Sequence, residues 1–336
     1  GGGIVVVADG NVGQEYEQID VPVFSSDGKK VFYVATRRGK KVVVAGGKES
    51  EEFDAIIPGA AFSRDGERFA FAARLDGKEM VVLDGQKLTP YDTIFPGSIQ
   101  FSPDGKRVAY VAGKGGRPRV VLDGQELPQY DAIIPGSIGF SPDSKRFVFG
   151  AVKDRRQMLV LDGKELKGYD AILHNSVRFS PDSARLAYAA VAAAGERQFV
   201  VVDEKEGPAF SAIGRNSPIF SPDSTRLAYA AQDRGRWKVI LDDKTPEQGW
   251  DATGSMEFSA DSKRFVYRVM NKQKVRLVVD DEPTREYDAI SDPVISPDSR
   301  HVAAMVEVDG KKLILFDGVE TSQRWDGSVG NSGLVF

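Results

Sequence analysis

The chain has 336 residues, of which 41% are hydrophobic and 28% are charged, and its formal net charge is -4. This composition is typical of a folded globular protein, and the small net charge gives no general attraction to nucleic acid or to a membrane surface. The sequence contains no cysteine, which excludes disulfides, thiol catalysis and cysteine metal sites. Its longest apolar run, Leu186–Ala194, is too short to span a bilayer.

One repeated segment organises the whole chain. Residues 101–112 read FSPDGKRVAYVA, and related segments return at intervals of about 40 residues, which is the mark of a repeat architecture. The copies begin near residues 24, 62, 101, 140, 179, 220, 258 and 295. No linker or change in composition interrupts them. The sequence therefore predicts a single domain over residues 1–336.

The repeat over residues 98–136 predicts four short antiparallel strands. In chain order these are a first strand (Ser98–Phe101), an SPDG turn, a second strand (Arg107–Ala112), a polar tip (Gly113–Arg117), a third strand (Arg119–Leu122), an Asp123-Gly124 hairpin and a more polar fourth strand (near Leu127–Ile133). The first three strands are apolar on both faces, so each sheet needs a neighbouring sheet on either side. The helical period of 3.6 residues is missing.

Stacked four-stranded units of this length indicate an all-β fold, a single β-propeller of four-stranded antiparallel blades. We expect the first strand to line a central channel and the polar fourth strand to form the outer edge. Ile4–Gly10 matches a third strand, Tyr16–Asp20 a fourth and Asn331–Phe336 a first. Nine blades are therefore favoured, the last formed by residues 1–20 and 331–336, which would remove exposed edges. Eight blades with frayed termini are the alternative. The opening Gly-Gly-Gly without methionine suggests a processed or trimmed chain.

The repeated frame F-S-P-D-G/S-K-R-hydrophobic resembles the TolB-like, WD-like propeller repeats of many bacterial proteins. The resemblance covers essentially the whole chain. It implies the propeller fold and, by family habit, an extracytoplasmic location, either periplasmic or secreted. It says little about function, because such propellers serve many roles. We find neither the hydrolase domain of prolyl-oligopeptidase-type enzymes nor the N-terminal domain of TolB.

Two sets of polar residues recur in nearly every repeat, and we predict that both are structural. An aromatic residue followed by an acid is expected to pack between blades, with the acid taking backbone or Lys/Arg donors: Tyr16-Glu17, Phe53-Asp54, Tyr91-Asp92, Tyr130-Asp131, Tyr169-Asp170, Trp250-Asp251, Tyr287-Asp288 and Trp325-Asp326. A basic residue six positions after the motif aromatic is expected to pair with the turn aspartates, such as Asp65 and Asp104: Lys30, Arg68, Arg107, Arg146, Arg185, Arg226 and Arg264, with His301 in the last copy.

Candidate ligand-binding residues are those that break this symmetry. Gln100, Arg178 and Glu257 stand where other copies have small or aliphatic residues. The Pro-Gly of the turn into the first strand becomes His174-Asn175 and Arg215-Asn216 in the fifth and sixth copies. We expect these residues to gather at one sector of the channel mouth, because convergent polar groups mark pockets. Alternatively, they only hold water in the channel.

The tips between second and third strands are rich in basic residues, including Arg117, Arg155, Arg156 and Arg236. The hairpins between third and fourth strands carry acids instead. This polarity predicts that one face attracts an anionic partner. The alternative is that these tips are simply solvated.

Two functions remain open from the sequence. The favoured one is a non-catalytic binding scaffold that recognises a protein or peptide, with an anionic polymer as a further candidate. The alternative is a lyase- or hydrolase-type enzyme that uses the mixed polar sector. His174 and His301 sit in non-neighbouring repeats and no metal-ligand spacing or nucleotide motif occurs. We therefore predict no catalytic residue, metal or cofactor, and a monomer.

Overall fold

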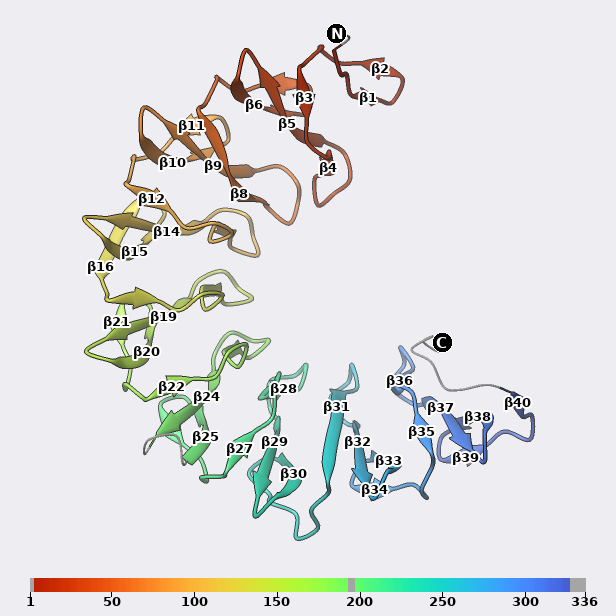
Figure 1. The fold of residues 1–336 in the computed structure, drawn as a ribbon. Coiled ribbons are helices and arrows are strands. Elements are labelled where there is room, and N and C mark those ends of the chain that lie inside the picture. The colour runs from red at the N-terminus through yellow and green to blue at the C-terminus, as the bar shows by residue number, and fades with distance from the viewer. Residues whose placement is uncertain (1–2, 193–196, 327–336) are drawn as a thin grey trace. The chain divides into compact units, whose positions relative to one another are not determined.

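The computed structural model describes residues 3–192 and 197–326, which contain forty β-strands and no helix (Figure 1). Within these ranges there is consequently no helix long and apolar enough to cross a membrane. The chain divides into two compact units, Gly1–Gly168 and Tyr169–Phe336, and the boundary falls between two sheets. The prediction of an all-β fold is confirmed.

Unit 1 begins with a two-stranded hairpin and continues with four larger antiparallel sheets. The hairpin is β1 (Val7–Ala8) and β2 (Asn11–Val12). The next two sheets are β3 (Gln18–Ile19), β4 (Val23–Phe24), β5 (Val31–Arg37), β6 (Lys40–Ala45) and β7 (Lys48–Glu49), then β8 (Ala55–Phe62), β9 (Phe69–Leu75), β10 (Lys78–Leu83) and β11 (Gln86–Lys87). The last two are β12 (Thr93–Ile94), β13 (Gln100–Phe101), β14 (Val108–Lys114), β15 (Arg117–Leu122) and β16 (Gln125–Gln129), then β17 (Ala132–Ile133), β18 (Gly139–Phe140), β19 (Phe147–Lys153), β20 (Arg156–Leu161) and β21 (Lys164–Glu165).

Unit 2 contains four sheets of the same kind. The first two are β22 (Ala171–Ile172), β23 (Arg178–Phe179), β24 (Leu186–Ala192), β25 (Arg197–Val202) and β26 (Lys205–Glu206), then β27 (Ala212–Ile213), β28 (Ile219–Phe220), β29 (Leu227–Asp233) and β30 (Arg236–Leu241). The others are β31 (Ala252–Phe258), β32 (Phe265–Asn271), β33 (Lys274–Val279) and β34 (Glu282–Pro283), then β35 (Ala289–Ile290), β36 (Val294–Ile295), β37 (Val302–Val308), β38 (Lys311–Phe316), β39 (Val319–Glu320) and β40 (Trp325–Asp326).

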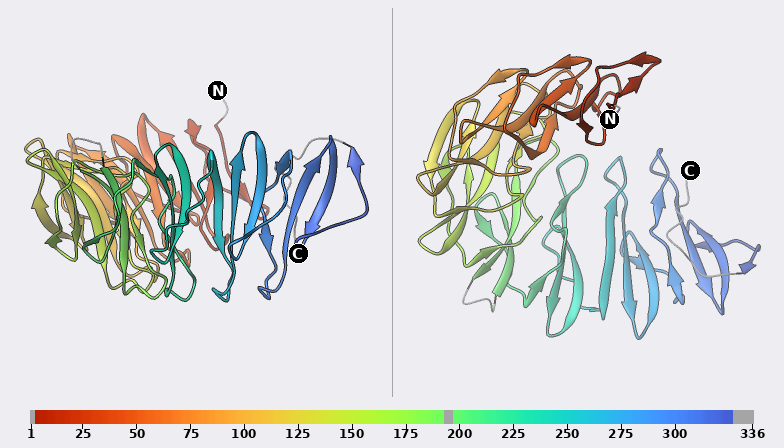
Figure 2. Two further views of the ribbon diagram at one scale, coloured as in Figure 1. Left: turned by 90° about the horizontal axis from the view of Figure 1, so that it is seen from below. Right: turned by 45° about the horizontal axis from the view of Figure 1, so that its top comes forward.

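The centre of each larger sheet is a long hairpin of second and third strands. In the type repeat, β14 pairs with β15 from Ala109 opposite Leu122 to Lys114 opposite Arg117. Nearly all residues of β14 are buried, because apolar side chains project from both faces and a sheet lies against each. Figure 2 shows the sheets of each unit following one another in chain order. The predicted blade, a four-stranded antiparallel sheet, is thereby confirmed, whereas the number of blades stays a prediction.

The predicted fourth strand near 127–133 is wrong in its bounds. β16 pairs with β15 of its own sheet, but β17 pairs with β19 of the next sheet. The chain crosses at Asp131, whose N–H already donates to Val152 O. The first strand of most sheets is therefore split into two short pieces, such as β12 and β13, that both pair with the second strand.

The same shift applies at the N-terminus. The predicted third strand at 4–10 is a short hairpin strand that pairs with a returning segment at 11–16, with Val7 opposite Val12 and Ile4 bridged to Tyr16. Gln18–Ile19 is the first strand of the following sheet, not a fourth strand. The predicted closing strand at 331–336 lies outside the described residues, so closure by both termini stays a prediction.

The SPDG turn is held by its own side chains. Ser102 Oγ donates to Asp104 Oδ1 at 2.6 Å, and the N–H of Lys106 donates to the same oxygen at 3.1 Å. Ser102 Oγ also accepts the N–H of Arg107 at 3.0 Å. Gly105 has a φ of 72°, which glycine adopts without strain. The hydrogen bond from Ser102 is the main cause of a pKa of Asp104 below its ordinary value.

We expect Asp104→Ala to lower the thermal unfolding midpoint by a few degrees, because the turn loses its carboxylate acceptor. Asp104→Asn is the control, since it keeps an oxygen at the same place and should lose less. Calorimetric scans of the three proteins measure the effect. An unchanged midpoint in the alanine variant would contradict this structural role of the motif.

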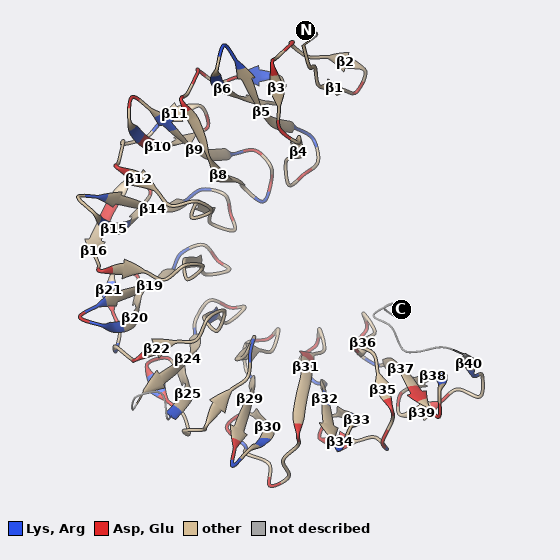
Figure 3. Cartoon of the chain, viewed as in Figure 1, with Lys and Arg blue, Asp and Glu red and all other residues tan. Residues whose placement is uncertain are grey.

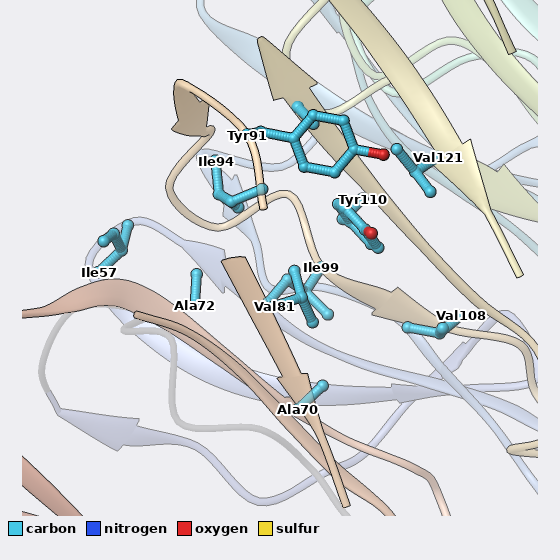
Figure 4. Packing of buried hydrophobic residues seen from close by; sticks show 11 residues of the cluster. Ile57, Ala70, Ala72, Val81, Tyr91, Ile94, Ile99, Val108, Tyr110 and Val121 are labelled. Atoms are coloured by element: carbon cyan, nitrogen blue, oxygen red, sulfur yellow. The ribbon is translucent and has the colours of Figure 1, made fainter. Parts of the chain in front are cut away.

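The core lies between neighbouring sheets. Figure 4 shows one such layer, in which Tyr91 and Tyr110 pack with Ile94, Ile99 and Val121. The rings of Tyr91 and Tyr110 meet edge to face, with centroids 6.3 Å apart. The predicted packing of the motif aromatic between sheets is therefore confirmed.

Within a unit, the repeated basic residue ties one sheet to the next, although not through the expected partner. Arg68 Nε pairs with Asp84 Oδ2 of the third-to-fourth hairpin at 2.9 Å, not with the turn aspartate Asp65. Arg68 Nη1 donates to the carbonyl oxygens of Gly105 and Lys106 in the next sheet at 2.9 and 2.8 Å. The turn aspartate is unavailable because its Oδ1 already accepts from the serine and backbone of its own turn. The same hairpin pairing recurs in Arg107–Asp123, Arg146–Asp162, Arg185–Asp203, Arg226–Asp242, Arg264–Asp280 and His301–Asp317.

The acid after the motif aromatic has the structural role that was predicted for it. Asp92 Oδ1 pairs with Lys78 Nζ of its own sheet at 2.7 Å, and Oδ2 accepts the N–H of Gly115 in the next sheet at 2.8 Å. The acid therefore joins two successive sheets. Equivalent backbone N–H bonds reach Glu17, Asp54, Asp131, Asp251 and Asp288.

A second tie joins the motif tyrosine to a glutamate on the fourth strand of the next sheet. The phenol donates to the glutamate at 2.6 to 3.0 Å in Tyr16–Glu49, Tyr169–Glu206 and Tyr287–Glu320. In Tyr91–Glu126 and Tyr130–Glu165 the glutamate charge adds to the effect of burial in raising the tyrosine pKa. Where the aromatic is Phe53, Phe210 or Trp250, the residue at the glutamate position is Lys87, Thr245 or Pro283. The two positions therefore change together along the chain.

Candidate binding site

The residues that break the repeat in unit 2 lie on the segments that lead into and through the first strands. His174 and Asn175 occupy the turn between β22 and β23, and Arg215 and Asn216 the turn between β27 and β28. All four are exposed. Figure 3 shows many of the charged residues at turns and at strand ends.

The backbone explains the two asparagines. Asn175 has a φ of 57° and Asn216 a φ of 58°, close to the 68° of Gly97 and Gly136 at the equivalent positions. Asparagine is one of the few residues other than glycine that tolerates this left-handed conformation. Asn175 and Asn216 therefore keep the turn, and the freedom to present a functional side chain belongs to the residue before each.

That preceding residue is His174 or Arg215, at a position where proline stands in three other repeats. The turn beneath His174 is rigid, because buried Ser176 donates its Oγ to Leu173 O at 2.7 Å and accepts the N–H of Ala189 at 3.0 Å. Ser217 makes the corresponding bond to Gly214 O at 2.7 Å. In both turns the backbone is held in place by these hydrogen bonds, and the side chain of His174 or Arg215 is exposed to solvent.

The other two predicted residues of unit 2 lie on the first strands themselves. Arg178 is half-buried opposite Ala187, and its Nη1 donates to Val177 O at 2.9 Å. Glu257 lies on β31 opposite Val266. Gln100 lies in unit 1, half-buried on β13 opposite Ala109.

A polar cluster of Arg268, Ser255 and Asp292 links two successive sheets, and the charge of Asp292 acts on Glu257. Arg268 on β32 donates from Nη1 to Ile290 O at 2.7 Å and from Nη2 to Asp292 Oδ1 at 2.5 Å. Ser255 Oγ donates to the same aspartate oxygen at 3.0 Å. Arg268 Nε is buried and has no hydrogen-bond partner in the described residues.

A change in the local chain makes room for this cluster. The entry segments of these two sheets, 253–257 and 290–294, lack the Pro-Gly-Ser turn of the earlier repeats. Gly254 lies close to Arg268: a Cβ at this glycine would stand 3.2 Å from Arg268 Cβ and 3.3 Å from its Nε. A larger residue at 254 would therefore displace the guanidinium.

Sequence reasoning missed Arg268, Ser255 and Asp292. The signal was present in the second strand, where the residue equivalent to Arg268 is small or aliphatic in the other copies: Val34, Ala72, Val111, Gly150, Ala189, Ala230 and Met305. A charge at this otherwise apolar position indicates a local function or a local ion pair, and the structure shows the pair.

The charge of Asp292 and the loss of surrounding water both act on the carboxyl of Glu257. Glu257 stays partly exposed, yet removal of water around its carboxyl, followed by the nearby Asp292 charge, raises its pKa above the ordinary value. Asp292 is neutralised by Arg268 at 2.5 Å. The cluster can therefore offer both donors and acceptors to a polar ligand.

The basic residues predicted at the tips differ in the ion pairs and hydrogen bonds that they form. Arg236 forms an ion pair with Asp251 and donates to Gly249 O at 2.7 Å. Arg117 and Arg156 begin their third strands, and Arg155 occupies the hairpin turn with a φ of 63°. Neighbouring tip cations pair with carboxylates: Lys40 with Asp54, Lys153 with Glu165 and Lys274 with Asp288. These pairs reduce the excess positive charge of the tips, and the anionic partner stays a prediction.

The two histidines do not form a common site. His301 takes the place of the repeated arginine, and its Nδ1 lies 2.6 Å from Asp317 Oδ2. Residues 3–192 and 197–326 contain no group of three or more His, Asp or Glu side chains placed to hold a metal ion.

No protein-family description and no curated protein matches this sequence. Among solved structures, a eukaryotic initiation factor is similar at 13% identity and a TM-score of 0.40, over 84% of this chain and 96% of that one. The Dos1 propeller is similar at 14% identity and 0.37, over 88% and 90%. TolB from Acinetobacter baumannii is similar at 15% identity and 0.34, over 86% and 78%. Similarity at this level does not indicate a function. The function proposed below is argued from the residues of this chain.

Proposed function

We propose that the protein is a non-catalytic recognition module of the TolB-like propeller type. It holds a protein or peptide ligand against the first-strand segments of unit 2. His174 and Arg215 supply positive or ionisable groups from two successive sheets, and Glu257 supplies an acid from the third. The ligand is expected to carry both acidic and basic groups to match them.

The observation that supports this proposal is a contrast between the repeated polar residues, which bond to a neighbouring sheet, and the non-repeated ones, which are exposed. The arginines, aspartates and tyrosines of the frame are bonded to the neighbouring sheet, as Arg68, Asp92 and Tyr169 illustrate. The three non-repeated residues are instead exposed, and they lie in or just before the first strands: His174, Arg215 and Glu257. A rigid frame that carries exposed departures on loops is the arrangement typical of binding sites.

We expect a triple variant, His174→Ala, Arg215→Ala and Glu257→Gln, to lose the native ligand. The wild-type protein and the variant are used as bait in extracts of the source cells, and captured proteins are quantified by mass spectrometry. A matched control variant, Lys205→Ala, Asp243→Ala and Glu282→Gln, changes three exposed residues of the third-to-fourth hairpins. A specific partner should be captured by wild type and control alike.

The captured partner is then purified, and its affinity should fall at least tenfold in the triple variant. Equal affinities for wild type and triple variant would contradict the proposed site. The enzyme alternative is favoured by the position of Glu257 near the Arg268–Asp292 ion pair, where partial burial and the Asp292 charge raise its pKa. Cleavage of the purified partner by wild type but not by Glu257→Gln would replace the binding proposal with that alternative.

A further inference from the structure

The β1–β2 hairpin of unit 1 has the backbone contacts of a third and a fourth strand, but in the described residues no second strand pairs with it. Two contacts give this correspondence: Ile4 bridges Tyr16 as Glu79 bridges Tyr91, and Gly13 N–H donates to Val6 O as Leu88 N–H donates to Val81 O. Asp9 therefore stands at the hairpin position of Asp84. In the later sheets the second strand is the one that carries the repeated arginine.

The hairpin packs on the next sheet in the same way as the later sheets pack on one another. The Tyr16 phenol donates to Glu49 Oε1 at 2.6 Å, which repeats the tyrosine–glutamate tie of later sheets. Asp9 and Lys29 line one groove of about 580 Å³ between the hairpin and the sheet of β3 to β7. The surroundings of the arginine in the later sheets can therefore be compared directly with those at Asp9.

Four groups hold the arginine in the later sheets, as Arg68 shows. Its Nε lies 2.9 Å from Asp84 Oδ2 of its own sheet. Its Nη1 donates to the carbonyl oxygens of Gly105 and Lys106 in the next sheet. Its guanidinium carbon lies 5.3 Å from the centre of the Phe101 ring. Three further arginines lie over the motif ring of the next sheet at 5.2 to 5.5 Å: Arg107, Arg185 and Arg226.

The first hairpin and its neighbouring sheet present the same four groups. Asp9 supplies the carboxylate, Gly28 and Lys29 supply the two carbonyl oxygens, and Phe24 supplies the ring. None of these oxygens accepts a hydrogen bond from residues 3–192 or 197–326. Phe24 is 67% exposed, whereas the rings at the equivalent position of later sheets are buried or half-buried. A carboxylate, two carbonyls and an aromatic face match the planar donors of a guanidinium better than an ammonium.

β1 also presents the backbone edge on which a second strand pairs. Val6 turns its C=O toward Gly13 of the returning segment, so the N–H and C=O groups of its neighbours Val5 and Val7 turn to the opposite edge. Val5 is 40% exposed and Val7 is 59% exposed. In the later sheets this edge carries the long pairing with the second strand, as β10 pairs with β9. The edge can therefore accept an added strand whose arginine reaches Asp9.

We propose that this edge binds an extended, arginine-bearing segment of a partner protein, which pairs with β1. The arginine lies between Asp9 and Phe24 and donates to the carbonyl oxygens of Gly28 and Lys29. The residue after the arginine donates its N–H to the second oxygen of Asp9, as in the later sheets. Residues 327–336 contain no lysine or arginine, so they cannot supply this cation. The site lies within unit 1 and is separate from the binding site proposed for unit 2.

The test uses a fluorescein-labelled synthetic peptide with the sequence of residues 105–114, GKRVAYVAGK, which contains a second strand of this chain. Its binding to the wild-type protein is measured by fluorescence anisotropy. The same peptide with citrulline in place of its arginine keeps the shape and loses the charge, so it should bind about tenfold more weakly. Methylation of the backbone nitrogen of the next valine should also weaken binding, because this N–H donates to Asp9.

Protein variants locate the site. Asp9→Asn should bind the arginine peptide about tenfold more weakly, and asparagine tolerates the φ of 51° at this position. Asp76→Asn is the matched control, because it makes the same change at an exposed aspartate with the same φ and should bind like wild type. Phe24→Ala should weaken binding about threefold through loss of the ring beneath the guanidinium.

The proposal is overturned if wild type binds the arginine and citrulline peptides equally, or if Asp9→Asn binds the arginine peptide as well as wild type does. Dimerisation of wild type that is lost in Asp9→Asn, seen by sedimentation velocity, would identify a second copy as the occupant and would also overturn it. The peptide comparison uses only the wild-type protein, so it decides the question even if Asp9→Asn fails to fold.

Discussion

Replacing Glu126 with alanine is expected to lower the free energy of unfolding by about 3 kcal/mol, because it leaves a buried cation without its partner. The side chain of Arg119 is 8% exposed and pairs with Glu126 Oε2. Arg119 Nε has no partner even in the intact protein. Loss of the carboxylate therefore leaves the guanidinium in an environment that neither water nor another described acid compensates.

Urea unfolding followed by fluorescence measures this effect. Glu165→Ala is the matched control, because Glu165 lies at the same position of the next sheet but pairs with Lys153, whose side chain is about half exposed. An exposed pair of this kind contributes about 0–1 kcal/mol. If both variants lose the same stability, burial of Arg119 is not what makes the first pair important.

Replacing Glu79 with alanine is expected to cost about 2–3 kcal/mol through lost hydrogen bonds to a charged acceptor. Glu79 is buried and joins two sheets, since its Oε2 accepts the N–H of Ile94 at 2.7 Å and the hydroxyl of Thr93 at 3.2 Å. Arg74 Nη2 lies 2.6 Å from its other oxygen. Ile94 is 1% exposed, so water cannot replace the lost acceptor.

The matched control is Glu79→Gln, because another repeat of this chain already has glutamine at the equivalent position. Gln198 occupies the equivalent position, and its Oε1 accepts the N–H of Ile213 at 2.8 Å. Glutamine at 79 should therefore keep the bond to Ile94 and lose only the contribution of the charge. Equal destabilisation by alanine and glutamine would contradict a role for this backbone bond.

The charge of Glu79 also predicts a pH dependence. Burial disfavours the ionised carboxyl, but the bonds from Ile94 N–H and Arg74 outweigh it and hold the pKa of Glu79 below its ordinary value. A lowered pKa in the folded state contributes stability above the unfolded pKa, and this stability is lost as the pH falls through the folded pKa. The stability difference between wild type and Glu79→Gln should therefore shrink from pH 7 to about pH 3.

The repeated ties suggest how the chain separates stability from recognition. Within each unit, successive sheets are joined by an arginine, an acid and, in most cases, a tyrosine, as Arg107, Asp92 and Tyr16 illustrate. The binding site proposed for unit 2 lies where these rules are broken, at the first-strand segments. A ligand can therefore be held without disturbing the contacts that keep the sheets stacked.

The period of the repeat, the all-β class and the long central hairpins could be predicted from the sequence alone. They depend on local chemistry: a continuous apolar run in β14, the hydrogen bonds of the SPDG turn and Asp-Gly hairpins. The structural role of the motif aromatic and acid was also predictable, because a residue present in every copy serves the frame. The exposed departures at His174, Arg215 and Glu257 were visible for the same reason.

Other features required the tertiary structure, because they depend on which strands lie side by side. The crossing at Asp131 places Ala132–Ile133 in the following sheet, and no pattern within one repeat indicates this. The partner of Arg68 is Asp84 and not Asp65, because the turn aspartate is already occupied by its own serine. The cluster of Arg268, Ser255 and Asp292 arises between segments distant in sequence. Local propensity acts over a few residues, whereas these contacts are decided by the stacking of whole sheets.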